Sequence, residues 1–375
     1  MPRRFMTDPD QTRTMAGLTA HTCGLDRRRT SAAIPVIHVG PGMYSWGGAS
    51  SVIRVIHDNK IGADQIRALS TWNGPWPGSA RGHVKNLFLT ARSAVALTRA
   101  SRTNIVHFHI TNGGAWLREG ALIRLARARG CRVIVTIHGD DFPRFAQSHP
   151  RIVGTTLNHT NHVILLSEEA RSAAAGLVPS VPTSVVANPI AIDRDAPGAS
   201  STPPVVLFAG TIGRRKGVDI LVEAWRLLLA EGIEGRCRIV GLVDDYAPPP
   251  TERLSVEGPV HPDAVRELLR SVRVVALPSF AEAMPMILTE ALAGARPFVA
   301  TPVGGTAEIA SDPSMLVPVG DAPALAAAIG RYLRDPDLAE RDGLRGQTHV
   351  AATRSPVVID AELRRIYEGC RNAAG

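Results

Sequence analysis

The chain has 375 residues, of which 20% are charged and 45% hydrophobic, a composition typical of a globular protein rather than a disordered or fibrous one. This length predicts two or three domains with ample core. No apolar run approaches the ~18–20 residues of a membrane-spanning helix, and no apolar stretch follows the first residues as in a cleaved signal peptide. The four cysteines lie far apart, which predicts reduced thiols in a cytoplasmic protein and argues against a disulfide scaffold or a zinc site: Cys23, Cys131, Cys237 and Cys370.

The net charge of +8 is unevenly distributed along the chain. Residues 1–195 carry 23 Lys and Arg against 12 Asp and Glu, a net of +11, whereas the remainder carries a net of −3. A basic half suggests nucleic acid, an anionic membrane surface or a phosphorylated lipid as a partner, with a solvated Arg-rich surface as the alternative. Nucleic acid is the least favoured, because no basic run is interleaved with aromatic residues, which make up 5% of the chain.

Residues 1–33 are polar and lack periodicity, so we interpret them as a flexible N-terminal extension. Short apolar runs then alternate with stretches that have apolar residues at helical spacing. The alternation predicts an α/β domain over residues 34–194, with a parallel sheet covered on both faces. Strands are expected at 34–39, 104–110, 131–137, 162–166 and 183–186, and helices at 51–57, 84–100 and 115–129.

The segment 195–204 is rich in Pro, Gly and Ser and predicts a domain boundary. The alternation restarts after it and predicts a second domain over 195–355. Two Rossmann-like domains facing each other across a cleft are the simplest architecture, with ligands at the carboxyl ends of the strands. Strands are expected at 205–209, 237–241, 254–257, 272–277 and 297–300, and helices at 218–230, 262–269, 286–293, 324–334 and 357–367.

Two glycine-rich turns each follow a predicted strand. Gly47 and Gly48 open a helix, where backbone amides can approach a phosphate, but Ser45 breaks the dinucleotide-binding fingerprint and a plain turn is the alternative. The second turn runs over 208–217 and holds Arg214, Arg215 and Lys216, a cluster that suits a diphosphate. Its spacing does not fit a Walker loop, which disfavours an ATPase.

Two carboxylates flank the start of a predicted helix. Glu282 lies just before Pro285, which suits the first turn, and Glu290 lies about two turns in. Carboxylates accept hydrogen bonds from vicinal hydroxyls, and the free amides of the first turn favour a diphosphate between them. A nucleotide sugar has that layout of hydroxyls, diphosphate and hydroxyls. Ordinary helix-capping acids are the alternative.

Several histidines lie in or after predicted strands. His138 follows the strand 131–137 and is expected to point into the cleft, whereas His107 and His109 lie within a strand as core or edge residues. Asp140 and Asp141 suggest a metal pair, but adjacent positions face different ways and no third ligand is evident. No metal site is therefore predicted.

The order of these motifs resembles the retaining GT-B glycosyltransferases of family 4, also called glycosyl transferases group 1. The resemblance covers roughly residues 34–367, and its most specific part is the Glu282–Glu290 segment with the residues up to 297. Further matching pieces are the residues 188–193, the segment from Gly210 to Gly217, and 301–308. Six motifs in the family's order are stronger evidence than any one of them.

The resemblance implies a role for each matching residue. Gly47 and Gly48 would contact the donor phosphate or the acceptor, and the residues from Gly258 to Val260 would read the nucleobase. The helix within 356–375 would cross back onto the first domain. The implied catalytic residues are His138 beside the transferred sugar, Lys216 at the diphosphate and Glu282 at the sugar hydroxyls. In the implied donor site, Glu290 would bind the ribose. The other implied donor-site residues are Gly210, Arg214, Arg215, and the amides around Ala283, Met284, Met286 and Ile287.

The implied activity is a metal-independent hexosyl transfer with retention, from a UDP- or GDP-linked sugar to a lipid-linked or glycan acceptor. Bacterial exopolysaccharide or glycolipid assembly at the inner face of an anionic plasma membrane is the expected setting, and no cofactor is expected. Two departures from the family stand out: Thr211 replaces an Arg, for which Arg214 or Arg215 could substitute, and Ala283 replaces a Gly. An epimerase of the same fold and a non-catalytic nucleotide-sugar-binding partner remain the alternatives.

Overall fold

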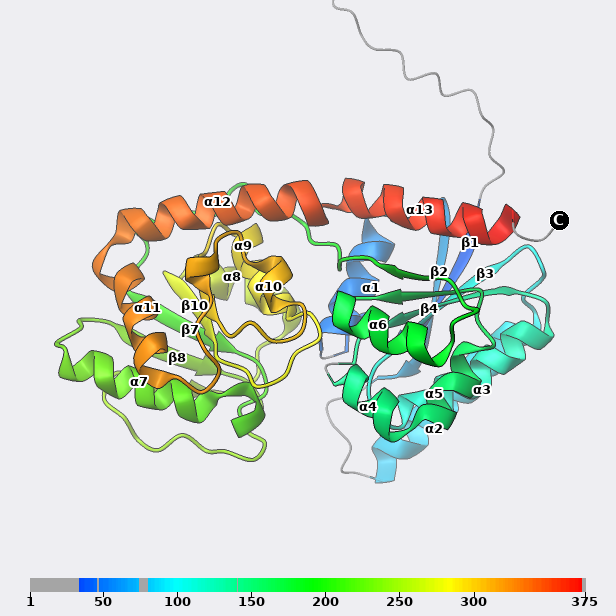
Figure 1. Cartoon of the computed structure of the whole chain (residues 1–375), viewed down its shortest axis with the longest axis horizontal. Helices are drawn as coiled ribbons and strands as arrows, with labels where there is room; N and C mark the ends of the chain where they lie inside the picture. Colours follow the sequence, from blue (N-terminus) through cyan, green and yellow to red (C-terminus); the bar gives the residue numbers. More distant parts are fainter. Residues whose placement is uncertain (1–33, 46, 74–79, 140, 373–375) are drawn as a thin grey trace, which may run out of the picture. The chain divides into compact units, whose positions relative to one another are not determined.

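In a computed structural model, the structure describes residues 34–45, 47–73, 80–139 and 141–372. The predicted N-terminal extension lies outside these ranges. The described residues belong to one compact unit that contains two separate parallel β-sheets (Figure 1). The α/β class predicted from the sequence is therefore confirmed, while the exact domain limits stay a prediction.

The first sheet has six parallel strands in the order β2-β1-β3-β4-β5-β6. Its central strands are buried on both faces, as their continuous apolar sequences predict. The strands are β1 (Pro35–Pro41), β2 (Gln65–Trp72), β3 (Ile105–Ile110), β4 (Arg132–Ile137), β5 (His162–Leu165) and β6 (Thr183–Val185). The helices between them are α1 (Gly48–Asp58), α2 (Ala80–Thr98), α3 (Ala115–Ala128), α4 (Phe142–Ser148), α5 (Pro150–Leu157) and α6 (Glu168–Leu177).

The second sheet has five parallel strands in the order β11-β10-β7-β8-β9. Its strands are β7 (Val205–Ala209), β8 (Arg236–Val240), β9 (Leu254–Glu257), β10 (Val274–Leu277) and β11 (Phe298–Ala300). Its helices are α7 (Val218–Ala230), α8 (Pro262–Arg270), α9 (Met286–Ala293), α10 (Thr306–Ile309), α11 (Ala322–Arg334) and α12 (Pro336–Arg354). Three short 3-10 turns complete this part: η1 (Ala199–Ser201), η2 (Arg214–Lys216) and η3 (Pro313–Met315).

The last helix, α13 (Pro356–Asn372), returns to the first sheet (Figure 1). The hydroxyl of Tyr367 lies 2.7 Å from Nδ1 of His107 on β3, and the carboxylate of Asp360 accepts a hydrogen bond of 2.7 Å from the amide of Gly62. Pro356 cannot continue α12, and Ser355 before it is extended, so α12 and α13 are separate helices. The predicted crossing of the C-terminal helix back to the first domain is confirmed.

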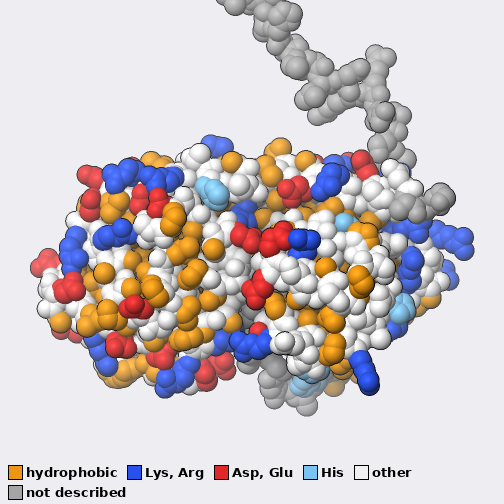
Figure 2. Space-filling view, in the orientation of Figure 1, with side chains coloured by type: hydrophobic (Ala, Val, Ile, Leu, Met, Phe, Trp, Pro, Cys, Tyr) orange, Lys and Arg blue, Asp and Glu red, His pale blue; other side chains and the backbone are white. Residues whose placement is uncertain are grey.

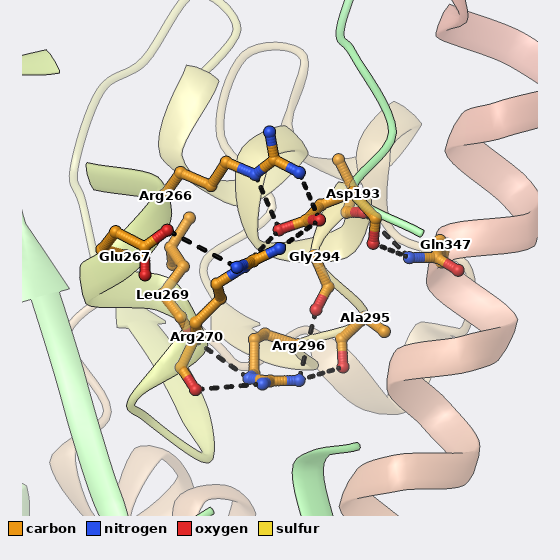
Figure 3. A network of polar contacts seen from close by, with 10 residues as sticks. Asp193, Arg266, Glu267, Leu269, Arg270, Gly294, Ala295, Arg296 and Gln347 are labelled. Carbon is orange, nitrogen blue, oxygen red and sulfur yellow. Dashed lines mark hydrogen bonds and ion pairs between the residues drawn. The ribbon is translucent and has the colours of Figure 1, made fainter. Parts of the chain in front are cut away.

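A polar network stabilises the segment that joins β6 of the first sheet to β7 of the second (Figure 3). Asp193, in this connection, accepts paired hydrogen bonds from Arg266 and Arg270 of α8, which hold its pKa well below its usual range. Gln347 of α12 donates to the carbonyl of Asp193 at 3.0 Å. Close by, the buried Arg296 donates to backbone carbonyls around the ends of α8 and α9. Two residues of the sequence motifs, Asp193 and Arg296, thus hold the scaffold together rather than line a ligand site.

Some elements were not predicted from the sequence. The edge strand β2 has mixed polar and apolar residues and is largely half-exposed, so it lacks the apolar run of a central strand. The helix α12 was missed for a related reason: it is polar along most of its length, although its small residues allow close packing. A Cβ on Gly343 would lie 2.2 Å from the carbonyl oxygen of Ala295. The helices α4, α5 and α6 were also absent from the sequence prediction.

The surface shows how the uneven charge is arranged in space. On the face in Figure 2, Lys and Arg side chains lie in scattered groups beside Asp and Glu rather than in one continuous patch.

Cys131, Cys237 and Cys370 are buried free thiols, and Cys23 lies outside the described residues. Among the described helices, none combines the length and apolar character needed to cross a bilayer.

Candidate active site

A cleft of about 1380 Å³ is lined by residues from both sheets. Its walls come from the segments that follow β1, β3 and β4 on one side and β7, β8 and β10 on the other. These are the carboxyl ends of parallel strands, where the sequence analysis expected a ligand. The volume exceeds the ~300–1,000 Å³ of most small-molecule pockets, so the cleft can hold a ligand larger than a typical small molecule.

Lys216 and Glu282 form an ion pair inside this cleft. The Nζ atom of Lys216 lies 2.6 Å from Oε1 of Glu282, and the hydroxyl of Ser279 donates to the same oxygen at 2.7 Å. The two charged side chains are 16% and 5% exposed, so the pair is shielded from solvent. Because both bonds use Oε1, Oε2 remains for a ligand hydroxyl, and the ammonium keeps further N–H groups for an anion.

Two helices begin at the cleft, close to one another. The helix α1 starts after Gly47, whose φ is 117°, and α9 starts after Pro285. A Cβ on Gly48 would lie 3.1 Å from Cγ of Met286, so the two helix starts almost touch. Neither first turn contains an acidic residue, and the unpaired amides together with the helix dipoles favour an anion there. The two phosphate-binding segments predicted from the sequence are thus side by side.

Two glycines allow the backbone to pass close to the Glu282 segment. Gly217 has φ 67°, and a Cβ there would lie 1.9 Å from the carbonyl oxygen of Pro278. Gly304 has φ 54°, and its Cβ would lie 1.9 Å from the carbonyl oxygen of Glu282. Any larger residue at either position would displace the segment that holds this carboxylate. The glycines of the basic loop and of the 301–308 motif therefore position a neighbouring side chain.

The two candidate arginines of the basic loop have different surroundings. Arg215 lines the cleft. Arg214 is not among the lining residues: it pairs with Asp219 at 3.0 Å and lies over the ring of Tyr246, 5.1 Å from its centroid. Of the two cations that could compensate for Thr211, Arg215 is the one at the cleft.

Glu290 is the fifth residue of α9, a little over one turn from its start, so the expected separation of two turns was too long. Its carboxyl group lines the cleft and is half-buried. Burial raises its pKa to about 7, although Arg54 on α1 lowers it in part. The carboxyl is therefore close to its titration midpoint at neutral pH, and a ligand that donates hydrogen bonds to it favours the ionised form.

His138 lies just beyond β4 and lines the cleft, as predicted. Its Nε2 atom lies 2.9 Å from Nδ1 of His109. Burial lowers the pKa of His138 to about 4, so the ring is neutral at pH 7. His107 and His109 are 1% exposed and belong to the core of the first sheet.

The remaining predicted donor residues fall mostly, but not all, on the cleft wall. Gly258 is not among the lining residues, whereas its neighbour Pro259 is. The helix-start segment lines the cleft as a continuous stretch. The predicted residues found on the wall are Gly47, Gly48, Gly210, Val260, Ala283, Met284, Met286 and Ile287.

Much of the opposite wall was not predicted from the sequence. This wall includes residues 111–114 after β3, parts of α2, and Arg118 of α3. A Cβ on Gly139 would lie 2.2 Å from Oδ1 of Asn112, so the glycine after His138 makes room for this loop. The loop could have been found, because it directly follows a predicted strand. The α2 residues could not, since their helical pattern gave no sign of which face meets the cleft.

Only one residue of the acidic pair Asp140 and Asp141 lies in the described part of the chain. Asp140 lies outside the described residues, and Asp141 pairs with Arg144 at 3.2 Å. In the described part of the chain, the one group with the spacing of potential metal ligands is His38, His107 and His109, whose ligand atoms lie within 4.8 Å of one another. This group is buried in the first sheet rather than in the cleft wall.

The two Rossmann-like sheets, the cleft at their carboxyl ends and the returning C-terminal helix define a protein of the GT-B fold. Residues 203–335 match the family described as glycosyl transferases group 1. This segment contains Lys216, Glu282 and Glu290.

Known proteins agree with this class. Alpha-D-kanosaminyltransferase from Streptomyces kanamyceticus is 29% identical over 176 residues, which cover 44% of this chain and 45% of that protein. Sucrose-phosphate synthase from Thermosynechococcus elongatus has a similar structure, with a TM-score of 0.68 at 18% identity over 91% of this chain and 100% of that one. Anabaena HepE in complex with UDP gives a TM-score of 0.63 at 15% identity, over 90% and 100% of the two chains. The chain spans less than half of the length of the first curated relatives it matches.

Proposed function

We propose that this protein is a retaining glycosyltransferase that moves a hexosyl group from a nucleotide diphosphate sugar to an acceptor hydroxyl. The observation that carries the proposal is the Lys216–Glu282 pair beside two converging helix starts. A cation and free amides suit a diphosphate, and a carboxylate 2.6 Å from that cation suits sugar hydroxyls. Three structural neighbours were solved with UDP, which supports a uridine nucleotide as the first donor to test.

The proposed reaction rests on positioning and on stabilising the leaving group. As the bond between the anomeric carbon and the diphosphate oxygen breaks, negative charge grows on the diphosphate. Lys216, Arg215 and the amides at the starts of α1 and α9 would stabilise that charge in a shielded site. Glu282 and His138 would hold the sugar so that its anomeric carbon faces the acceptor. The acceptor would attack from the face that the diphosphate leaves, which retains the configuration and lets the diphosphate take the acceptor's proton.

The acceptor would bind at the wall formed by the first sheet. That wall combines apolar and polar side chains with Arg118, whose guanidinium pairs with Glu119 at 3.0 Å. Such a surface suits a glycan or lipid-linked acceptor, and bacterial exopolysaccharide or glycolipid assembly is the proposed setting.

Association with an anionic membrane is part of this proposal. Along α2, exposed apolar residues recur at helical spacing, at Val84, Leu87, Phe88 and Val95, and Leu87 also lines the cleft. Exposed Lys85 lies within the same stretch. A helix with exposed apolar and basic residues beside an acceptor site would hold the enzyme at the inner face of a membrane that carries the acceptor.

The test is a donor screen by nucleotide release, with UDP- and GDP-linked hexoses, in the presence and absence of a lipid-diphosphate acceptor. Acceptor-dependent release and a glycosylated product support the proposal. Conversion of the sugar without acceptor would instead indicate an epimerase. Binding of nucleotide sugar without any turnover would indicate a non-catalytic partner, the alternative to which Thr211 points.

A further inference from the structure

Three histidines form a hydrogen-bonded chain from the cleft into the core of the first sheet. Nε2 of His138 lies 2.9 Å from Nδ1 of His109, and Nε2 of His109 lies 2.9 Å from Nδ1 of His38. His38 and His109 are 1% exposed, and His138 is at the cleft wall. The far end of the chain, Nε2 of His38, is buried without a hydrogen-bond partner among the described residues.

All three rings are neutral. The two inner rings are enclosed by the sheet and its helices, where an imidazolium without a counter-ion is costly. Burial lowers the pKa of each ring, and the facing groups that contribute, His57, His107 and His138, are themselves histidines, which lower the pKa further. Among the described residues no carboxylate bonds to any of the three rings. Each ring therefore carries one N–H.

Counting protons leaves two arrangements. Each of the two hydrogen bonds needs one N–H and one bare nitrogen, so two of the three protons lie within the chain. If Nδ1 of His38 is protonated, the bonds run outward and Nδ1 of His138 carries the last N–H. If Nε2 of His38 is protonated, the bonds run inward and Nδ1 of His138 is bare. The proton position at one end fixes that at the other.

The buried end decides between the two arrangements. The inward arrangement leaves an N–H in the core without an acceptor, and among backbone groups orphaned buried N–H donors are rarer than under-satisfied acceptors. The outward arrangement leaves no N–H in the core without an acceptor: the buried end is a bare nitrogen, and the last N–H lies at the cleft, where water or a ligand accepts it.

We propose that the His38–His109–His138 chain fixes His138 as a hydrogen-bond donor toward the cleft through Nδ1. His109 and His38 are then positioning residues that act through His138. In this orientation His138 presents a donor to a ligand oxygen and cannot accept a proton at Nδ1. Its role at the sugar rests on the proposed glycosyl transfer, whereas the direction of the chain does not.

A metal ion is the competing explanation for buried histidines. His107, the third member of the spaced group, already uses both ring nitrogens: Nδ1 lies 2.7 Å from the hydroxyl of Tyr367 and Nε2 lies 2.7 Å from that of Thr136. His109 uses both nitrogens as well. A cation would have to break these bonds, so we assign the cluster to hydrogen bonding.

The direct test is ¹⁵N NMR of the full chain with labelled histidine and no ligand, since protonated and bare ring nitrogens resonate far apart. The His138 signals are assigned by their loss in His138→Asn. We expect a protonated Nδ1 and a bare Nε2 in His138, and the same pattern in His109. A protonated Nε2 in His138 would overturn the proposal. A stoichiometric shift of the His38 signals on adding ZnCl₂ would also overturn it, in favour of a metal site.

A matched pair of variants separates positioning from folding. Asn at position 109 keeps a donor near the place of Nδ1, whereas Leu removes it. We expect His109→Asn to keep the His138 pattern, and His109→Leu to give a mixture of both tautomers with a KM for the donor about tenfold higher, the worth of about one hydrogen bond. Equal spectra in the two variants would contradict the proposal.

The NMR spectra test the direction of the histidine chain and the activity tests the proposed function, so either proposal can fail alone. An outward chain in a protein that transfers no sugar rejects the proposed function and keeps this inference. An inward chain in an active glycosyltransferase does the reverse.

Discussion

The two walls of the cleft differ in how firmly their residues are held in place. On the side of the second sheet, the ligand-facing groups are tightly constrained: Glu282 is bonded to Lys216 and Ser279, and glycines are required where the backbone passes within contact distance. On the side of the first sheet, the wall includes half-exposed and exposed residues of α2 such as Leu87, which is 72% exposed. One wall is thus held firmly and the other less so, which fits the proposed binding of one nucleotide at the second sheet and of acceptors of varied shape at the first.

The strongest way to break this comparison is to remove the charged pair. Lys216→Ala should lower kcat by about 100-fold or more, because the developing charge on the proposed diphosphate would lose a cation that is shielded from solvent. Arg214→Ala is the matched control, since Arg214 pairs with Asp219 outside the cleft lining, and it should stay within about twofold of the wild-type protein. Steady-state kinetics with circular dichroism checks both. Near-normal turnover in Lys216→Ala would refute the assignment.

The constrained backbone gives the next largest effect. In Gly304→Ala the new methyl group meets the Glu282 carbonyl oxygen, so the Glu282 segment must shift; we expect turnover to fall by about tenfold or more. Gly232→Ala has a similar φ, 75° against 54°, but its Cβ meets nothing within 4 Å. It should therefore show only the backbone cost of ~1–2 kcal/mol in unfolding free energy, with normal kcat. Similar losses of activity in both variants would argue against a precisely held carboxylate.

The pH dependence of nucleotide binding sharpens the role of Glu290. A ribose diol donates hydrogen bonds, so it binds the ionised carboxylate and displaces the proton held below the raised pKa of about 7. UDP affinity should therefore rise from pH 6 to pH 8, by up to about tenfold, and then level off. Titration calorimetry with UDP measures this. In Glu290→Gln the rise should disappear; a rise that persists there would assign it to another group.

The smallest expected effect concerns the wall on the side of the first sheet. Leu87→Ser combined with Phe88→Ser should reduce binding to vesicles of anionic phospholipid severalfold, because the two side chains supply much of the exposed apolar area of α2. UDP affinity should not change. Val357→Ser is the control, as this side chain is 79% exposed on a different helix. Vesicle binding that survives the double substitution, or that does not weaken with salt, would contradict the membrane proposal.

The strands of the second sheet were predicted more completely than those of the first, because an element with a clear local pattern can be predicted and one that depends on distant partners cannot. The helix α9 was predicted with its observed bounds, since an apolar period and Pro285 mark it. The edge strand β2 and the polar helix α12 were missed, because their place depends on partners distant in the sequence. For the site, residue types and order indicated Lys216 and Glu282, but not that they bond to each other. That contact joins residues 66 positions apart and is visible only in three dimensions.

The hydrogen bonds between the histidines also join residues that are distant in the sequence, so they were not predicted. The strand positions of His107 and His109 predicted burial, but periodicity does not reveal which ring nitrogens meet. His38 lies on β1 opposite His107 on β3, a pairing that requires strand order as well as strand position. The sequence therefore predicts that these polar residues are buried, whereas their hydrogen-bond partners are known only from the structure.

The return of α13 to the first sheet has a consequence for synthesis of the chain. The ribosome releases the first sheet's strands early, yet one face of that sheet is covered by Tyr367 and its neighbours, which emerge near the end. Between the end of β6 at Val185 and the start of α13 at Pro356, 170 residues (356 − 185 − 1) are made, at ~5–20 residues per second. The contacts between the first sheet and α13 can therefore form only after α13 itself has been made.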